Sequence, residues 1–261
     1  MRIALGLEYD GGSFHGWQSQ ADGGGVQDAL ERALGAVADA RIGVVAAGRT
    51  DAGAHATMQV VHFDTGAVRP DTAWVRGTNA HLPQSIAVRW AVPVEPPFHA
   101  RFAATGRHYT YLLLDRPVRP ALLNGKVGWY HRPLAIEAMR AAAAALLGRH
   151  DFSAFRAAEC QARSAIKTLD RLDIAREDDV VHFDLHAESY LQHMVRNIVG
   201  ALVYVGSGRQ APGWVRALLE SRDRARGAPT FAASGLYLTG VDYPTHWNLP
   251  LTVVPVRVPQ R

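Results

Sequence analysis

The chain has few of the residues that crosslink proteins or anchor them in membranes. Cys160 is its one cysteine among 261 residues, so no intrachain disulfide can form. No stretch approaches eighteen consecutive apolar residues, which argues against a transmembrane helix. The N-terminal residues also lack the apolar run and small-residue cleavage site of a signal peptide. These absences predict a soluble protein of a reducing, cytoplasmic compartment, in which Cys160 is a spectator thiol.

The motifs of common cofactor-dependent and metal enzymes are missing as well. The sequence contains no Gly-x-Gly-x-x-Gly and no P-loop. It has no Cys-x-x-Cys, no His-Glu-x-x-His and no Gly-x-Ser-x-Gly elbow. Twelve histidines are present, but His55 and His62 straddle a strand break, and His182 and His186 only share a strand face. We therefore expect no cofactor and no metal.

Lysine is scarce, whereas arginine is abundant. Only Lys126 and Lys167 are lysines, so 26 of the 28 cations are arginines, and the sequence pI is about 9.4 at a formal charge of +4. The planar fork of arginine binds phosphate bidentately. A GC-rich genome also favours arginine, alanine and glycine, and this bias accounts for most of the excess. Basicity alone therefore indicates a nucleic-acid partner only modestly.

Hydrophobic periodicity predicts an α+β fold. Strands are predicted at residues 3–9, 42–47, 58–64, 86–92, 107–115, 168–176, 180–187 and 236–242, and helices at residues 26–37, 135–148, 191–206 and 212–221. Residues 93–97 are predicted to be a linker. The order of the elements lacks a regular β-then-α rhythm, which favours a mainly antiparallel sheet. We divide the chain into an N-terminal half, residues 1–104, and a C-terminal half, residues 105–261.

The octet of residues 48–55, Gly-Arg-Thr-Asp-Ala-Gly-Ala-His, places one carboxylate between two glycines on a loop between predicted strands. Glycine permits backbone angles and close approaches that other residues do not. A loop on a rigid scaffold is a common carrier of catalytic groups. The alternative is that Asp51 forms a turn by accepting bonds from nearby amides.

Two further segments carry polar residues in patterned positions. Tyr109 and Tyr111 share one face of the predicted strand 107–115, and such a pair is most often half-buried packing. In the helix 191–206, Arg196, Asn197 and Gly200 lie opposite the apolar face. Such a side is usually solvated, but Gly200 would let another element approach closely.

The octet, followed by Gln59-Val60-Val61-His62-Phe63, resembles the active-site motif of the tRNA pseudouridine synthases of the TruA family. The resemblance covers the whole chain, and no block is missing. The other similar blocks, in family order, are residues 8–18, 98–102 with 107–111, 150–156, 193–200 and 235–238. The departures, His108 and Thr110, fall at positions where the family itself varies.

The resemblance implies a pseudouridine synthase fold, with two similar halves that share a central sheet and an active cleft between them. It implies an isomerase that converts uridine to pseudouridine in the anticodon stem-loop of tRNA, at positions 38–40, without a cofactor and as a homodimer. Asp51 is then the catalytic carboxylate, which attacks C1′ or the ring or removes a sugar proton. Arg196 is its ion-pair partner and favours the ionised form that nucleophilic attack requires.

The resemblance also assigns residues to substrate binding. The ring of Tyr109 lies against the target base, a contact worth roughly 1–3 kcal/mol, and Leu236 lines the pocket. Arg49 enters the RNA as the base leaves or grips the displaced strand; its alternative is a surface cation. The candidates for phosphate contacts are Arg101, Arg107, Arg156 and Arg163.

Two other classes of protein share some of these features. A non-catalytic RNA-binding module would share the basicity and the tyrosine pair, but it would not explain an anion, Asp51, where phosphates come close. An aspartate-dependent hydrolase would release free base or phosphate, whereas a synthase releases nothing. Labelling of pseudouridine in tRNA distinguishes all three.

Overall fold

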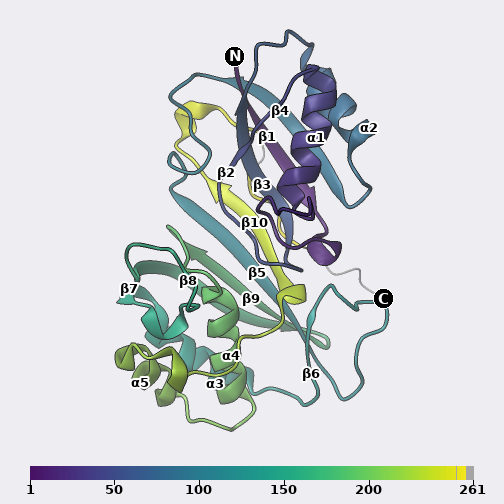
Figure 1. Cartoon of the computed structure of the whole chain (residues 1–261). Coiled ribbons are helices and arrows are strands. Elements are labelled where there is room, and N and C mark those ends of the chain that lie inside the picture. Colours follow the sequence, from purple (N-terminus) through teal and green to yellow (C-terminus); the bar gives the residue numbers. More distant parts are fainter. Residues whose placement is uncertain (251, 257–261) are drawn as a thin grey trace. The chain divides into compact units, whose positions relative to one another are not determined.

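The structure is a computed structural model of the chain, and it describes residues 1–250 and 252–256. The chain forms two compact units, one comprising Met1–Arg107 and the residues from Tyr237 onward, the other comprising His108–Leu236 (Figure 1). The division near residue 107 lies close to the proposed boundary at 104. The segment from Tyr237 onward, however, belongs to the first unit, because its strand β10 pairs with β3.

The first unit is a sheet with two helices. Its strands follow the order β4-β1-β3-β10, and β2 pairs with β3. Pairing is antiparallel except between β3 and β10, which run parallel. The elements are β1 (Arg2–Tyr9), α1 (Val26–Ala38), β2 (Val45–Ala46), β3 (His55–Asp64), α2 (Thr78–His81), β4 (Ile86–Val94) and β10 (Leu236–Asp242).

Helix α1 begins and ends where its sequence dictates. The Asp28 carboxylate accepts the Gly25 amide N–H at 2.9 Å, which satisfies a donor at the helix start. Asp39 then takes a left-handed conformation, φ 53°, and ends the helix. The residues that helical spacing predicts for the apolar face are buried, with the exception of the half-buried Val37. This face covers the sheet and makes α1 part of the core.

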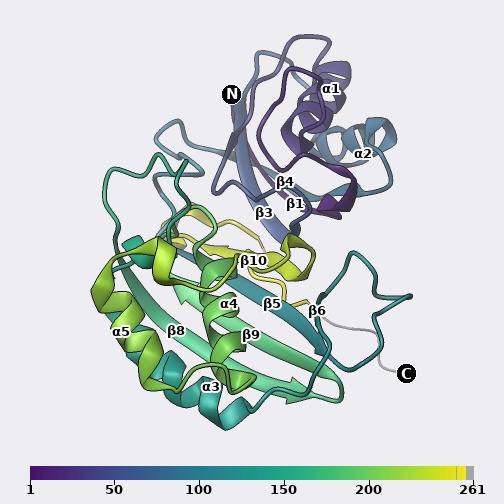
Figure 2. The ribbon, with the colours of Figure 1, turned by 60° about the horizontal axis from the view of Figure 1, so that its bottom comes forward.

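The second unit is a sheet with three helices. Its strands follow the order β5-β9-β8-β7, and β6 pairs with β5. In Figure 2, α3 and α4 lie across one face of β8 and β9. The elements are β5 (Gly106–Asp115), β6 (Gly128–Tyr130), α3 (Ile136–Ala143), β7 (Gly148–Asp151), β8 (Ile166–Glu177), β9 (Val180–Ala187), α4 (Met194–Gly206) and α5 (Gly213–Ser221).

The predicted α+β class with mainly antiparallel pairing is confirmed, but several element boundaries differ. Strand β3 begins at His55, three residues before its predicted start, so His55 and His62 lie in one strand and do not straddle a strand break. Strand β2 contains two residues, not six. Helix α3 ends at Ala143, five residues early, in a 3-10 turn. Helix α4 begins at Met194, because His193 has a positive φ of 63°. Pro93, predicted in a linker, belongs to β4. The edge position of β4 tolerates a residue that lacks an N–H.

In the part of the chain that the structure describes, no helix has both the length and the apolar character needed to cross a membrane. The longest helices, α1 and α4, have 13 residues each, whereas a span needs about 20.

Candidate active site

Asp51 lies on the loop between β2 and β3, as predicted. The Ala54 amide donates to the Asp51 carbonyl at 3.0 Å, which closes a turn. Gly53 has a φ of 79° in that turn, a conformation that favours glycine. The Asp51 side chain is half-buried and Arg49 is exposed. The loop therefore presents one carboxylate from a backbone of fixed shape.

Two glycines of the segment 8–18 pack directly against the Asp51 loop. A Cβ atom on Gly11 would lie 1.8 Å from the Ala54 carbonyl oxygen. A Cβ on Gly16, whose φ is 96°, would lie 2.9 Å from the Thr50 carbonyl oxygen. Real Cβ atoms do not approach so closely, so a side chain at either position would push the loop away. Main chain packed on main chain thus positions Asp51.

Hydrogen bonds hold the same loop on its other sides. The Tyr9 hydroxyl bonds the Thr50 hydroxyl at 2.8 Å, and the Trp17 amide donates to the Thr50 carbonyl at 3.0 Å. The Gln59 side-chain amide donates to the Gly48 carbonyl at 2.7 Å. Burial raises the pKa of the Tyr9 hydroxyl well above its usual range, so it stays neutral.

Sequence reasoning assigned no role to this supporting set, Tyr9, Gly11, Gly16 and Gln59. The signal was present, because all four lie in segments that carry the family resemblance. Without coordinates, however, nothing indicated that the segment 8–18 contacts the loop 48–55. The set is specified by long-range packing, which periodicity and spacing do not encode.

Two histidines beside the loop are engaged by the main chain. His55 is buried, and its Nδ1 lies 3.1 Å from the Gly11 amide and 3.0 Å from Asp10 Oδ1. His62 Nδ1 accepts the Ala100 amide N–H at 3.1 Å. Burial, with help from the charges of Arg2 and His99, lowers the pKa of His62 to about 4. Both rings therefore act as structural members of the first unit.

The two arginines of the first unit that were predicted to contact phosphate differ in their surroundings. The Arg107 guanidinium donates to the carbonyls of Ala47 at 3.0 Å and Arg101 at 2.9 Å, so it ties loop segments together. Arg101 is exposed, and its guanidinium carbon lies 5.7 Å from the ring centroid of Phe102. Phe102 is itself 76% exposed and stacks on His99. An exposed aromatic beside an arginine suits contact with an RNA base.

In the second unit, the tyrosines of β5 have different surroundings. The ring of Tyr109 is 8% exposed and meets that of Tyr190 edge to face, with centroids 5.0 Å apart. Tyr111 is fully buried, and its hydroxyl donates to the Ala232 carbonyl at 2.7 Å. Burial raises the pKa of Tyr111 well above its usual range. Tyr111 is thus the structural member of the pair.

The polar side of α4 is covered by the segment 228–235. The Arg196 Nε–H donates to the Phe231 carbonyl at 2.8 Å, and the Phe231 amide donates back to the Arg196 carbonyl at 3.3 Å. Asn197 Oδ1 accepts the Thr230 hydroxyl at 2.7 Å. A Cβ on Gly200 would lie 2.4 Å from the Pro229 carbonyl oxygen. The close approach expected at Gly200 is confirmed, and this side of α4 is not solvated.

Leu236 follows this segment and is buried. The preceding Gly235 packs so tightly on β5 that a Cβ there would lie 2.4 Å from the Leu112 carbonyl oxygen. The segment 228–235 is therefore fixed at both of its ends, on α4 and on β5. Its geometry determines where Leu236 begins β10, and the role of Leu236 in lining a pocket stays a prediction.

The predicted site residues are divided between the two units. Arg49, Asp51, Arg101 and Arg107 belong to the first unit, and Tyr109, Arg196 and Leu236 belong to the second. Within the first, Arg107 bonds the Arg101 main chain. The ion pair between Asp51 and Arg196 joins residues of different units, and it stays a prediction, as does the cleft between the halves.

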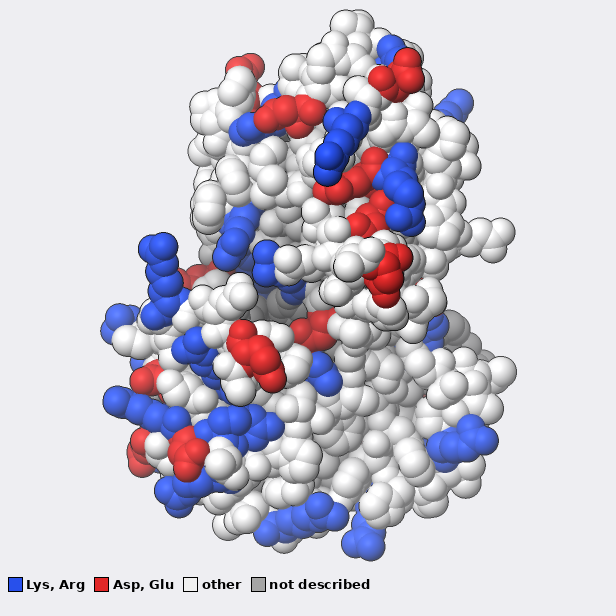
Figure 3. All heavy atoms as spheres, in the orientation of Figure 1, with Lys and Arg blue, Asp and Glu red and all other residues white. Residues whose placement is uncertain are grey.

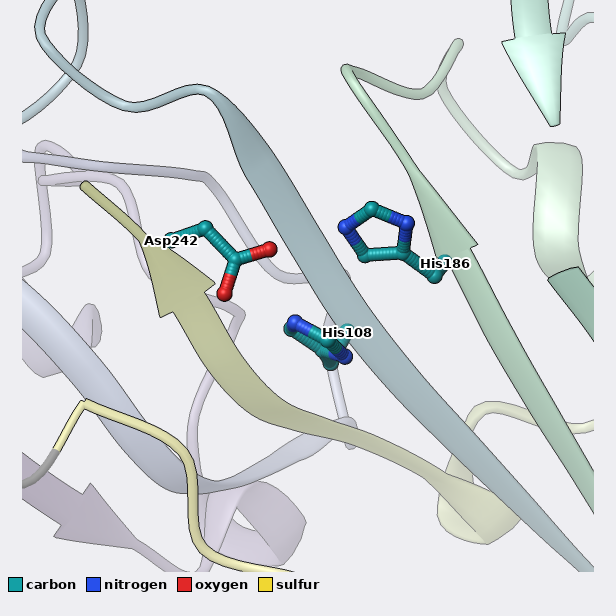
Figure 4. Close-up of side chains that lie close together, drawn as sticks. All are labelled: His108, His186 and Asp242. Carbon is teal, nitrogen blue, oxygen red and sulfur yellow. The ribbon is translucent and has the colours of Figure 1, made fainter. Parts of the chain in front are cut away.

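Two histidines of the second unit lie together on neighbouring strands. The ring centroids of His108 on β5 and His186 on β9 are 4.5 Å apart (Figure 4). His186 Nδ1 also lies 3.2 Å from a carboxylate oxygen of Asp170. Asp242, also labelled in Figure 4, belongs to the first unit.

Exposed arginines are concentrated on one part of the second unit. Figure 3 shows Lys and Arg side chains gathered over the region of β7 and α5. The exposed arginines of these elements and their adjoining loops are Arg149, Arg163, Arg209, Arg216, Arg222 and Arg226. Guanidinium groups in such numbers suit a polyanionic partner.

Comparison with known proteins agrees with these features. A sequence model of the tRNA pseudouridine synthase family matches residues 7–103 and 142–244. The chain is 60% identical over 250 residues to a tRNA pseudouridine synthase A of Dechloromonas aromatica, which covers 96% of this chain and 95% of that protein. It is 62% identical over 251 residues to the protein of that name from Chromobacterium violaceum, which covers 96% of each chain.

A carboxylate on a loop of fixed shape and a surface rich in arginine are compatible with an enzyme that acts on RNA. The matches are specific enough to give the family: the chain belongs to the tRNA pseudouridine synthases. It is therefore an isomerase, and its reaction converts uridine in tRNA to pseudouridine.

Proposed function

We propose that Asp51 is the catalytic carboxylate of this isomerisation and that the target uridines lie in the anticodon stem-loop, at positions 38–40. In the reaction the glycosidic C–N bond breaks, the uracil turns, and a C–C bond to the same sugar carbon forms. The base must leave its stack to be reached. The observation that carries the assignment is the Asp51 loop itself, whose backbone is held by Gly11 and Gly16 without room for a side chain.

Arg196 is the proposed ion-pair partner of Asp51. The bond from its Nε–H to the Phe231 carbonyl, at 2.8 Å, fixes the plane of the guanidinium. A planar fork in a fixed orientation matches the two oxygens of a carboxylate. The adjacent positive charge favours the anionic form of Asp51, which every proposed route of attack requires.

Tyr109 is the proposed platform for the uracil base. Its support is the edge-on contact with Tyr190, which limits the orientations of the Tyr109 ring. Its hydroxyl is proposed to move the proton that leaves the base carbon after the new C–C bond forms. Leu236 is proposed to line the pocket beside the base.

The arginines of the first unit are proposed to contact the RNA in different ways. Arg49 and Arg101 are exposed. Arg49 is proposed to contact the displaced strand, and Arg101 is proposed to contact phosphates. Arg107 donates to the main chain of Ala47 and Arg101. We therefore propose that it maintains the conformation of the segment around Arg101 as well as binding the RNA. The exposed arginines near β7 and α5 extend the surface for the tRNA backbone.

The family resemblance also supports a homodimer in the cytoplasm. Cys160, the one cysteine, is a free buried thiol in the structure, in keeping with a reducing compartment. Sedimentation of the purified protein measures the dimer directly, and a monomer at micromolar concentration would contradict it.

Labelling of pseudouridine tests the catalytic assignment. Product and substrate have the same mass, so chemical labelling followed by primer extension is the suitable readout. The wild type should label the anticodon arm of tRNA. Asp51→Asn, which keeps the size and removes the charge, should form no product while binding tRNA within a few-fold of wild type.

Asp71→Asn, the same change at an exposed position of the first unit, is the control and should leave the reaction unchanged. Pseudouridine formed by Asp51→Asn at ordinary rates would falsify the assignment.

A further inference from the structure

Tyr190, in the turn between β9 and α4, has a buried hydroxyl that nothing in the proposed reaction uses. The side chain as a whole is half-buried, but its oxygen is shielded from solvent. Among the residues that the structure describes, this oxygen has no hydrogen-bond partner. Most buried polar groups in proteins are paired, so an exception calls for an explanation.

The surroundings of Tyr190 connect it to the proposed base platform. Its ring meets that of Tyr109 edge to face, with centroids 5.0 Å apart and planes at 80°. Burial raises the pKa of Tyr190 well above its usual range, and the nearby Tyr109 and Asp170 act in the same direction. The group therefore keeps its proton and is a hydrogen-bond donor at every working pH.

Packing alone does not account for the Tyr190 hydroxyl. Burying an unpaired oxygen is unfavourable. A phenylalanine would make the same edge contact with Tyr109 and would avoid that cost. Tyr111, on the same strand as Tyr109, shows the ordinary arrangement, because its hydroxyl donates to the Ala232 carbonyl at 2.7 Å. The Tyr190 oxygen differs, because none of the residues at 1–250 and 252–256 offers it such a bond.

We propose that Tyr190 is a positioning residue for the uridine nucleotide. Its ring orients Tyr109, and its hydroxyl, shielded from solvent in the free protein, donates to the nucleotide once neighbouring side chains move on binding. A uracil carbonyl oxygen is an acceptor of the required kind. This inference rests on the proposed role of Tyr109 and adds to it a partner that acts only in the complex. The proposal explains why no residue that the structure describes pairs with the hydroxyl: its partner is the substrate.

The test separates the ring of Tyr190 from its hydroxyl. Tyr190→Phe keeps the edge contact and removes the oxygen, and Tyr190→Leu removes both. Tyr111→Phe, which breaks a satisfied bond, is the matched control. Thermal melting of the free proteins is measured together with single-turnover pseudouridine formation and tRNA binding.

For Tyr190→Phe we expect a melting temperature equal to or above that of the wild type, together with a single-turnover rate about tenfold lower, the size of one lost hydrogen bond. Binding of tRNA should change less than the rate, because contacts to the tRNA backbone remain. Tyr190→Leu should be slower again, by about a further tenfold, as the Tyr109 ring loses its support. Tyr111→Phe should show the opposite pattern, with a lower melting temperature and a rate per folded molecule near that of the wild type.

Two results would overturn the proposal. A Tyr190→Phe protein as fast as the wild type would show that the hydroxyl does not act on the nucleotide. A clearly lower melting temperature for Tyr190→Phe would show that the hydroxyl already has a partner in the free protein. Failure of the proposed role of Tyr109 is distinguishable from both, because Tyr109→Phe and Tyr109→Leu would then form pseudouridine at the rate of the wild type.

Discussion

The two units hold their proposed functional residues by different means. In the first unit, Gly11 and Gly16 bring main chain against the Asp51 loop at distances that leave no space for a Cβ. In the second, the Arg196 side chain donates to the Phe231 carbonyl and the Asn197 side chain accepts from the Thr230 hydroxyl, which ties α4 to the segment 228–235. Both units use close glycine contacts and hydrogen bonds, but the glycine contacts touch the Asp51 loop directly, whereas a side-chain hydrogen bond is made by Arg196 itself. Changes of side-chain volume should damage the first unit most, and changes of hydrogen-bonding chemistry the second.

The largest effect is expected where the chemistry itself depends on one hydroxyl of the second unit. Tyr109→Phe keeps the ring and removes the oxygen. If the hydroxyl moves a proton, binding should be normal and single turnover roughly 10²–10⁴-fold slower. Tyr109→Leu should also lose roughly 1–3 kcal/mol of binding to the flipped base. A phenylalanine variant as fast as the wild type would reduce Tyr109 to a stacking surface.

Substitutions of Arg196 test whether its proposed pairing with Asp51 requires the planar, bidentate guanidinium or only a positive charge. If Arg196 holds the proposed anionic Asp51 in place, losing one preorganised charged partner costs about 2.7–4 kcal/mol of transition-state stabilisation, so Arg196→Ala should slow product formation by roughly 10²–10³-fold. Arg196→Lys should fail nearly as badly, because an ammonium does not reproduce bidentate geometry. Arg216→Lys on α5, an exposed site, is the control. Near-normal kcat/KM for Arg196→Lys would argue against the pairing with Asp51.

Gly11 tests the role of shape in the first unit. The Cβ of Gly11→Ala would lie 1.8 Å from the Ala54 carbonyl oxygen, so the Asp51 loop must move. A displacement of about 1 Å at a reacting group can slow a reaction roughly 10²-fold. Gly12→Ala makes the same change next to it, where the nearest atom is a side-chain oxygen of Asp10 at 3.2 Å. Equal rates for the two variants would show that the glycine contact does not position Asp51.

The same glycine-to-alanine change at Gly200 tests close packing in the second unit, and here the measured quantity is the free energy of unfolding. Gly200→Ala forces its Cβ to within 2.4 Å of the Pro229 carbonyl oxygen and should lower the free energy of unfolding by about 1–3 kcal/mol. Gly213→Ala, at the start of α5 with no atom within 4 Å, should be neutral or stabilising. Urea denaturation measures both. The comparison between the units would weaken if Gly200→Ala changed activity more than Gly11→Ala.

The smallest expected effect is the pH dependence of stability that comes from His62 in the first unit. His62 titrates at about 4 in the folded state and near 6.5 when unfolded. The unfolded chain therefore binds more protons between these values, and stability falls as the pH is lowered through this window. From pH 7.5 to 5.5 the loss should be about 1 kcal/mol. His62→Gln should remove that part of the pH dependence. The free energy of unfolding is measured by urea denaturation at each pH, and an equal loss between pH 7.5 and 5.5 in the variant would contradict the assignment.

The sequence predicted local elements well and long-range contacts poorly. Alternation and helical spacing located β1, β5, β9 and α1 to within a residue or two, because each buries one regular set of side chains. The polar side of α4 was harder, since Asn197 is buried beneath a segment more than thirty residues away in sequence. The α4 start was missed because a positive φ at His193 leaves no compositional mark.

For the candidate site, the motif of residues 48–55 located the loop and its carboxylate. It gave no indication that Gly11, Gly16 and Tyr9 hold that loop, because these contacts depend on how β1 and β3 bring distant segments together. Arg107 was predicted from its type alone, and its bonds to main-chain carbonyls depend on local loop geometry that residue type does not specify.

The parallel pairing of β10 with β3 has a consequence for biosynthesis. Tyr237 pairs with His55 and Leu238 with Ala56, so one strand of the first unit is synthesised about 180 residues after its partner. The first unit therefore cannot complete its sheet while it emerges from the ribosome, whereas the second unit is continuous in sequence and can. Until then, the edge of β3 that pairs with β10, next to the Asp51 loop, lacks its partner strand. A nascent chain arrested before residue 237 should be protease-sensitive at the Asp51 loop and become resistant once β10 has been released.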